Sequence, residues 1–180
     1  MGLLVRRAIE ADFESIVDLQ MRNLVANLTP EERSDGFLSG YFDAQALRAT
    51  NENLAVVGCF DGEKTVGFIC LTTPSFKYSN DVAVAMLDRV KDFEIFGKPF
   101  HKWSVCLCGP VCIEKEYRGT GAFATLYEHI SQYAEGCDLL LTLIAKNNLR
   151  SIGAHRKVGQ EPVADFAWNN RSFLVLARLP

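Results

Sequence analysis

The stretch EKEYRGTGAFATLYEHI, from Glu114 to Ile130, places Arg118-Gly119-Thr120-Gly121 directly before a run of apolar residues with helical spacing. Glycines let a backbone approach a ligand closely, and the first N–H groups of a helix are unpaired and lie at the positive end of its dipole. The segment therefore favours either a tight strand-to-helix turn or a cradle for an anion such as phosphate, to which Arg118 would add a fixed charge. It lacks the Gly-Lys-Ser/Thr ending of a Walker loop and the third glycine of a dinucleotide fingerprint.

Runs with strand composition and runs with helical spacing alternate on both sides of this segment. The apolar run from Trp103 to Ile113 is interrupted by Gly109-Pro110, and because proline lacks a ladder donor we expect a bulge or splay there. Strands are expected at residues 3–8, 54–60, 65–73, 103–113, 139–145, 162–168 and 172–179, with hairpins turning at 61–64 and 169–171. Two helices are expected to begin at capping residues: one runs from Asp12 to about residue 28, and the other from Asn80 or Asp81 to Gly97. Two more are expected at residues 122 to about 136 and at about 150 to 158. One or two short helices are expected between residues 29 and 50. This order predicts an α/β protein with a mixed sheet and a ligand site within 103–158.

Composition predicts one soluble globular domain over residues 1–180, since 48% of the 180 residues are hydrophobic and 23% are charged. The net charge of −3, without a long Lys/Arg run, argues against nucleic acid or an anionic membrane as the main partner. The apolar run at the N-terminus ends after three residues, which fits neither a signal peptide nor a membrane span, so we expect a cytoplasmic protein. The six cysteines lie mostly in strand-like runs without the paired spacing of zinc sites, so we expect buried free thiols and no metal.

Two motifs together resemble the GNAT superfamily of N-acetyltransferases. The hallmark of that family is a long fourth strand with a bulge, followed by R-x-x-G-x-G/A at the start of a helix, and the chain reads CGPVCIEKEYRGTGAF there. The family's second signature is similar to AKNNLRSIGAHRKVG, in which Asn148, Ser151, His155 and Gly159 fall into register. The order of elements matches the family over nearly the whole chain, which implies a mixed, mainly antiparallel central sheet of about seven strands flanked by helices, with a splay or bulge in the fourth strand.

The resemblance implies acetyl-CoA as the acyl donor and assigns residues to it. The pyrophosphate would lie on the amides of Arg118, Gly119, Thr120, Gly121, Ala122 and Phe123, and the backbone of Val111, Cys112 and Ile113 would bind the pantetheine arm. Asn148 would help to orient that arm or the acyl end, although an Asn after a strand is comparably expected to cap a helix. Ser151 is also implied to bind the cofactor. The chain departs from the family at Phe123, which occupies a small-residue position and should point into the core, and at Gln160, which stands where an aromatic residue is frequent.

The implied reaction is direct attack of a primary amine on the thioester, with an acceptor that the sequence does not identify. A tyrosine commonly protonates the leaving thiolate in the family; His155 matches it here, and its ordinary pKa of ~6.5 leaves room for a different role. Glu114 is a candidate general base, with a chain of water molecules as the alternative. The acceptor pocket should draw on residues 27–41, 74–102 and 169–171, and the closing hairpin could pair across a homodimer. A non-catalytic acyl-CoA sensor is the main alternative function, and an unrelated phosphate-binding protein is a third.

Overall fold

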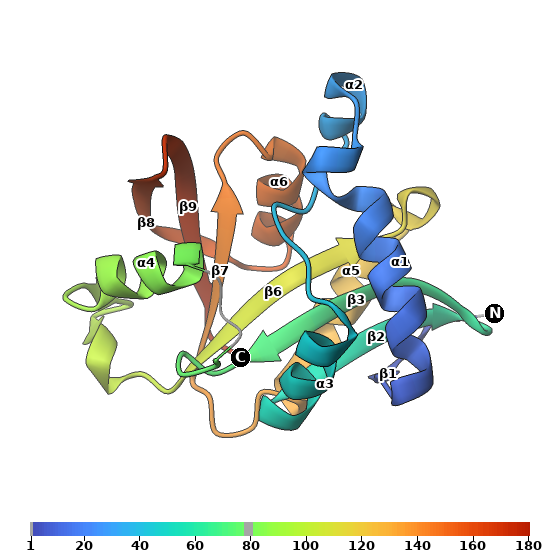
Figure 1. Cartoon of the computed structure of the whole chain (residues 1–180). Coiled ribbons are helices and arrows are strands. Elements are labelled where there is room, and N and C mark those ends of the chain that lie inside the picture. The colour runs from blue at the N-terminus through green and yellow to red at the C-terminus, as the bar shows by residue number, and fades with distance from the viewer. Residues whose placement is uncertain (1, 78–80) are drawn as a thin grey trace.

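The structure, a computed structural model, describes residues 2–77 and 81–180. Its centre is a seven-stranded sheet of order β1-β2-β3-β6-β7-β9-β8 (Figure 1). The strands are β1 (Leu4–Arg7), β2 (Ala55–Asp61), β3 (Lys64–Thr72), β6 (Val105–Ile113), β7 (Leu139–Ala145), β8 (Glu161–Trp168) and β9 (Arg171–Arg178). All neighbouring strands run antiparallel except β6 and β7, which run parallel. The expected mixed, mainly antiparallel sheet is therefore confirmed.

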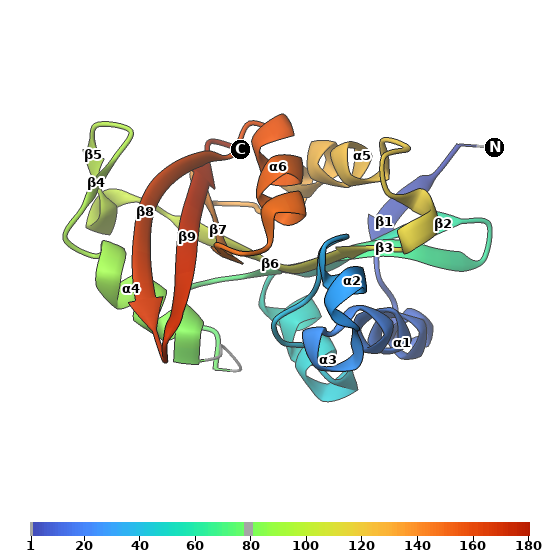
Figure 2. The ribbon, with the colours of Figure 1, turned by 90° about the horizontal axis from the view of Figure 1, so that it is seen from above.

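Helices cover both faces of the sheet (Figure 2). On one face lie α1 (Phe13–Asn23), α2 (Pro30–Arg33), α3 (Ala44–Asn53) and α4 (Asp81–Val90); on the other lie α5 (Ala122–His129) and α6 (Leu149–Lys157). Short 3-10 turns occupy Glu10–Asp12, Val25–Asn27, Phe100–Lys102, Lys115–Tyr117 and Ile130–Gln132, and β4 (Glu94–Ile95) pairs with β5 (Lys98–Pro99) in a small ribbon. In residues 2–77 and 81–180, every helix is too short or too polar to cross a membrane.

Alternation along the strands sends side chains into the two layers. Cys106 and Cys108 of β6 pack with α5, whereas Leu107 between them packs with α4. The residues of β2 and β3 alternate in the same way between α5 and the pair α1 and α3. Five of the six free cysteines are buried, as expected, and Cys137 is half-buried.

The pairing of β6 breaks at its middle. Against β3, Ile69 pairs with Val111 and Leu71 with Cys108, so three steps along β6 oppose two along β3 at Gly109-Pro110. Against β7, the pairs run only from Val105 with Leu139 to Leu107 with Leu141. Beyond this point β6 and β7 diverge (Figure 1), and the backbone of residues 111–113 has no strand neighbour on the β7 side.

Several element boundaries differ from the expectation. Helix α1 ends at Asn23 rather than near 28, because the chain turns there and Leu24 forms a parallel bridge with Leu38. The Asp12 carboxylate does not cap α1; it turns back to the Ile9 N–H at 2.7 Å and to Arg6. Helix α4 ends at Val90, because the following residues form the β4–β5 ribbon, and the alternative cap at residue 80 lies outside the described residues.

Candidate active site

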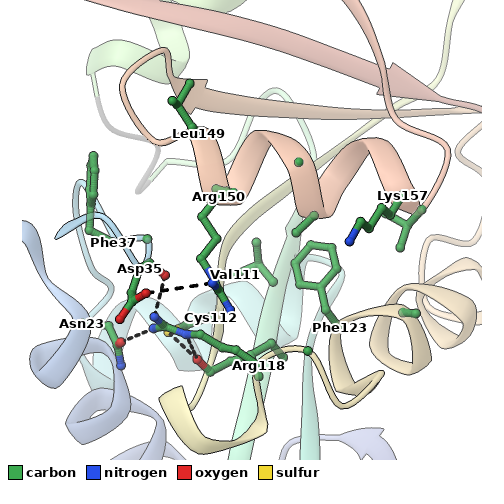
Figure 3. Close-up of a pocket in the computed structure, with 18 of the residues that line it drawn as sticks. Asn23, Asp35, Phe37, Val111, Cys112, Arg118, Phe123, Leu149, Arg150 and Lys157 are labelled. Carbon is green, nitrogen blue, oxygen red and sulfur yellow. Dashed lines mark hydrogen bonds and ion pairs between the residues drawn. The ribbon is translucent and has the colours of Figure 1, made fainter. Parts of the chain in front are cut away.

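A groove with a volume of about 500 Å³ lies where the sheet has opened (Figure 3). The turn before α5 and its first residues form one wall, α6 forms the opposite wall, and residues 111–113 of β6 form the floor. The loop around residues 35–38 closes one end. The groove thus brings together the two sequence motifs, which are separated by about 30 residues in the chain.

The turn before α5 presents unpaired N–H groups. Gly119 and Gly121 have φ of 82° and 98°, a region that favours glycine. In the described part of the chain, the N–H groups of Gly119, Gly121, Ala122 and Phe123 have no hydrogen-bond acceptor, as expected at a helix start. The amides of Arg118 and Thr120 are used within the turn, through bonds of 3.3 and 3.4 Å to the Lys115 and Tyr117 carbonyls. The potential anion cradle is therefore narrower than the expected run 118–123.

The Arg118 side chain donates hydrogen bonds to three segments of the protein. Its Nε donates to the Ile113 carbonyl at 3.0 Å and its Nη1 to the Asp35 carbonyl at 2.7 Å, while Nη2 donates to Asn23 Oδ1 (Figure 3). The guanidinium fork thus ties the end of β6, the loop at 35 and the end of α1 together. Its charge lies beside the groove while its directed donors bind protein, so a contact between this side chain and phosphate stays a prediction.

The positive charges that face the groove more freely come from α6, and the sequence reasoning missed them. Arg150 and Lys157 line the groove and are exposed (Figure 3). Arg150 lies 3.9 Å from the Asp35 carboxylate, and for Lys157 no ion pair occurs within the described residues. Their spacing of seven residues, with Gly153 and Ala154 between them, is two helical turns on one face, and this pattern could have revealed them.

A second, smaller cleft of about 170 Å³ adjoins the groove. It is bounded by the segment 37–42, the α4 side of the sheet around the β6 bulge, and β7. Phe37, Leu38, Val111 and Ser151 line both cavities, so the two meet beside the opening between β6 and β7. The two cavities can therefore hold two molecules, or two parts of one molecule, that meet at this junction.

Comparison with known proteins agrees with this arrangement. A sequence model of the Acetyltransferase (GNAT) family matches residues 13–160. The chain belongs to the GNAT acetyltransferase family. Members of this family are acyltransferases that use acetyl-CoA as donor, and the expected enzyme class is thereby confirmed.

Solved structures share the GNAT fold with this chain at low sequence identity. A GNAT acetyltransferase from Streptococcus agalactiae has a TM-score of 0.68 and 13% identity, over 100% of this chain and 96% of its own. The ribosomal-protein-alanine N-acetyltransferase of Brucella melitensis has a TM-score of 0.64 and 18% identity, over 98% and 99%. YncA from Salmonella typhimurium, solved with its cofactor acetyl-CoA, has a TM-score of 0.64 and 14% identity, over 99% and 94%. No curated protein sequence matches the chain significantly.

In this GNAT protein His155 is buried and neutral. The ring is 1% exposed, and it contacts the rings of Phe123 and Tyr127 edge-on with centroids 5.0 and 5.5 Å away. Burial lowers the pKa of His155 to about 4, against the opposing effect of the hydrogen bond to Ser151. Nδ1 lies 2.7 Å from the Ser151 carbonyl, which can only accept, so Nδ1 carries the proton and Nε2 carries a lone pair. Nε2 has no partner among the described residues, and the expected donation of a proton from His155 to the thiolate stays a prediction.

Asn148 serves as the cap of α6. Its Oδ1 accepts from the Ser151 N–H at 3.4 Å, and its Nδ2 donates to the Phe37 carbonyl at 2.8 Å. The side chain is buried and lines the second cleft rather than the groove. Asn148 therefore fixes Ser151 and Phe37, two residues of the junction, and the capping alternative describes its contacts.

Glu114 is placed unfavourably for a general base. It lines neither cavity; Oε2 accepts from Arg22 at 2.6 Å and Oε1 from the Lys115 N–H at 3.0 Å. Partial burial raises the pKa of Glu114, but the Arg22 guanidinium and the Lys115 N–H more than reverse this and leave it below its ordinary value. The carboxylate is therefore held by Arg22 and made less basic, and its expected role as a general base stays a prediction.

Phe123 stands in the groove as well as against the core. Its half-buried ring packs on Tyr127 with centroids 4.8 Å apart and also lines the groove, where it extends from α5 toward α6 (Figure 3). The ring therefore packs against the core, as expected, and also borders the groove. In the described chain, no group of three or more His, Cys, Asp or Glu side chains is arranged to hold a metal ion.

Proposed function

We propose that this GNAT protein transfers the acetyl group of acetyl-CoA to a primary amine by direct attack of the amine on the thioester. The observation that carries the proposal is the meeting of two cavities at the opening of the sheet. One has an anion cradle and a cationic rim, and in the other no Asp, Glu, Lys or Arg of the described residues lines the wall. Bound acetyl-CoA supplies an acetyl group already activated as a thioester.

The groove fits the donor. The free N–H groups of Gly119, Gly121, Ala122 and Phe123 would bind the pyrophosphate at the positive end of the α5 dipole. Arg150 and Lys157 would neutralise further phosphate charge from α6. On the β7 side, β6 has no strand partner at residues 111–113 within the described chain, although the Ile113 carbonyl accepts from Arg118. This edge would receive the pantetheine amides as an added strand does, with Ser151 and the cap Asn148 at the acyl end.

The cysteines support direct attack rather than an acyl-enzyme. Cys112, the cysteine that lines the donor groove, is 7% exposed, and burial raises its pKa to about 12. A thiol with this pKa is almost entirely protonated near pH 7, and the thiolate is the nucleophilic form. Initial rates measured over both substrates should therefore give intersecting double-reciprocal lines, and parallel lines would contradict direct attack.

His155 is proposed as a hydrogen-bond acceptor for the incoming amine. Its unprotonated Nε2 is buried without a partner, and the residue lines the acceptor cleft, so an N–H of the amine would satisfy it. With a pKa of about 4 the ring is a weak base, and the amine must arrive largely deprotonated. An inflection of kcat near pH 6.5 that disappears in His155→Gln would instead support an acid role with an ordinary pKa.

The first test measures the thermal midpoint with and without acetyl-CoA for wild type, Ala124→Glu and Ala124→Gln. Ala124 is exposed in the first turn of α5 and lines the groove, whereas Gly121, at φ 98°, would be strained by any side chain. A carboxylate at this helix start stabilises the free protein but competes with phosphate for the same N–H groups. Ligand at a hundred times its Kd stabilises the native state by about 2.7 kcal/mol. We expect that shift in wild type and in Ala124→Gln, and its loss in Ala124→Glu.

A turnover assay then separates the enzyme from the alternative. Release of the coenzyme A thiol is followed with a panel of primary amines. Turnover with any of them supports the transferase. Tight acetyl-CoA binding without turnover across the panel would favour the non-catalytic acyl-CoA sensor, and equal midpoints with and without millimolar acetyl-CoA would contradict both.

A further inference from the structure

Resting on the proposed function, we propose that the acceptor is a monoamine whose nitrogen is carried on an uncharged, ring-sized apolar group. The site is the cleft of about 170 Å³ on the acceptor side of the opened sheet.

Apolar side chains supply much of the lining of the cleft, and its polar residues within the described chain are Ser, Thr, Tyr, Asn and His. Aromatic rings come from Phe37, Tyr41, Phe42 and Phe173, and Leu143 and Met86 add aliphatic surface. No Asp, Glu, Lys or Arg lines the cleft within residues 2–77 and 81–180. Transfer of an uncharged apolar group from water to such a surface is favourable in free energy. A charged group would lose its hydration there without compensation.

Two polar side chains of the lining, Thr142 and Asn148, already have hydrogen-bond partners. Thr142 Oγ1 accepts from Gln160 at 3.2 Å, and Asn148 is occupied as the cap of α6. His155 offers a single buried acceptor, at Nε2. This set can orient one amine, but it holds no carboxylate for a second ammonium group.

A fixed positive charge stands beside the cleft. Arg171, at the start of β9, donates to Ser39 Oγ at 3.1 Å, and its guanidinium lies over the Phe173 ring, 5.2 Å from the centroid. Both contacted residues line the cleft, so the guanidinium would repel a second cationic group on the acceptor. The exposed cations of the donor groove, Arg150 and Lys157, would likewise disfavour a polycation.

The cleft is large enough for one ring-sized apolar group. A closed apolar cavity of roughly 150 Å³ accommodates benzene, so about 170 Å³ fits one ring with a short arm. Val111 and Ser151 line both cavities, and an amine on a two-carbon arm would therefore be carried from the cleft toward the junction.

The test compares 2-phenylethylamine with 1,4-diaminobutane. Both carry a primary amine on a chain, but the diamine retains a second ammonium group in place of the ring. The rate of coenzyme A thiol release gives kcat/KM for each amine, and we expect a ratio of at least about a hundredfold in favour of 2-phenylethylamine, since an unpaired charge would have to enter an apolar cleft.

A matched pair of variants tests the location of the subsite. Leu143 is half-buried on β7 and lines the cleft, so Leu143→Glu supplies the missing carboxylate while Leu143→Gln has the same shape without charge. We expect Leu143→Glu to lower the ratio at least about tenfold, because a carboxylate would pair with the second ammonium group. Leu143→Gln should lower the values for both amines by a similar factor.

Binding of each amine is also measured by calorimetry in the presence of coenzyme A, so that turnover and recognition are separable. If neither amine reacts but 2-phenylethylamine binds more tightly, the transferase proposal fails and the acceptor class stands. If 1,4-diaminobutane reacts or binds equally well or better, or if the two Leu143 variants change the ratio alike, the inference is overturned while the transferase proposal is unaffected.

Discussion

Replacing His155 by a group that does not titrate should flatten the acid side of the stability profile. The ring is 1% exposed and has a folded-state pKa of about 4, against an ordinary value of about 6.5 in the unfolded chain. Between these values the unfolded state binds more protons than the native state, so wild-type stability falls as the pH drops from 6.5 toward 4. At pH 5 the loss from this one residue is about 2 kcal/mol, and at most roughly 3.4 kcal/mol at lower pH, from 1.36 kcal/mol per pKa unit.

The assay is urea unfolding at pH 7 and pH 5 for wild type, His155→Phe and His155→Gln. Protonation of carboxylates that are ion-paired in the native state, such as Glu114, also lowers the stability of the protein in acid. This contribution is the same in all three proteins, so it cancels when their losses of stability are compared. His101→Gln, which removes an exposed imidazole, is the matched control. We expect the loss between pH 7 and pH 5 to be smaller by about 2 kcal/mol in both His155 variants. Equal losses in His155→Phe and wild type would refute the buried neutral ring.

Two further variants test the walls of the groove. Arg118→Met should lower the free energy of unfolding by about 2–4 kcal/mol, measured by urea unfolding, because three acceptors lose their donors. Arg118→Lys should not restore it, because an ammonium group lacks the guanidinium fork. An unchanged free energy of unfolding together with lost acetyl-CoA binding would show that the side chain binds phosphate. Phe123→Ala should lower the free energy of unfolding by about 1–3 kcal/mol, because the ring loses its contacts with Tyr127 and His155. The Kd for acetyl-CoA, measured by calorimetry, should stay equal or fall as the groove widens. A tenfold increase in Kd would instead identify the ring as a ligand contact.

The local features of the donor groove were predictable from sequence because each depends on neighbouring residues. Glycines at 119 and 121 before an apolar run require a turn with positive φ and a helix start, and proline at 110 removes a ladder donor. The two-residue turns at Gly62 and Asn169 followed from the same local chemistry, and their hairpins are confirmed by the pairs Asp61–Lys64 and Trp168–Arg171. Backbone conformation at these points is imposed within a few residues.

The roles of long or titratable side chains were not predictable, because distant segments decide them. Arg118 meets Asn23 and the Asp35 carbonyl, 95 and 83 residues away, and nothing near Arg118 in sequence indicates those acceptors. His155 has the pKa of a buried ring only because Phe123 and Tyr127 of another helix cover it. Alignment with the sequence motif therefore indicated where His155 lies in the chain, while tertiary packing determined the pKa of its ring.

The opening between β6 and β7 connects these observations. A continuous sheet would separate the donor groove on the α5 and α6 face from the cleft on the α4 face, since its backbone groups would be paired across the whole width. The bulge at Gly109-Pro110 ends the β6–β7 pairing after three residue pairs, and the cap Asn148 then holds Ser151 and Phe37 at the opening. The same break leaves a strand edge for the donor and lets the two cavities meet. Under the proposed function, a charged donor and an acceptor with an uncharged apolar group would approach from different surroundings and meet at this opening.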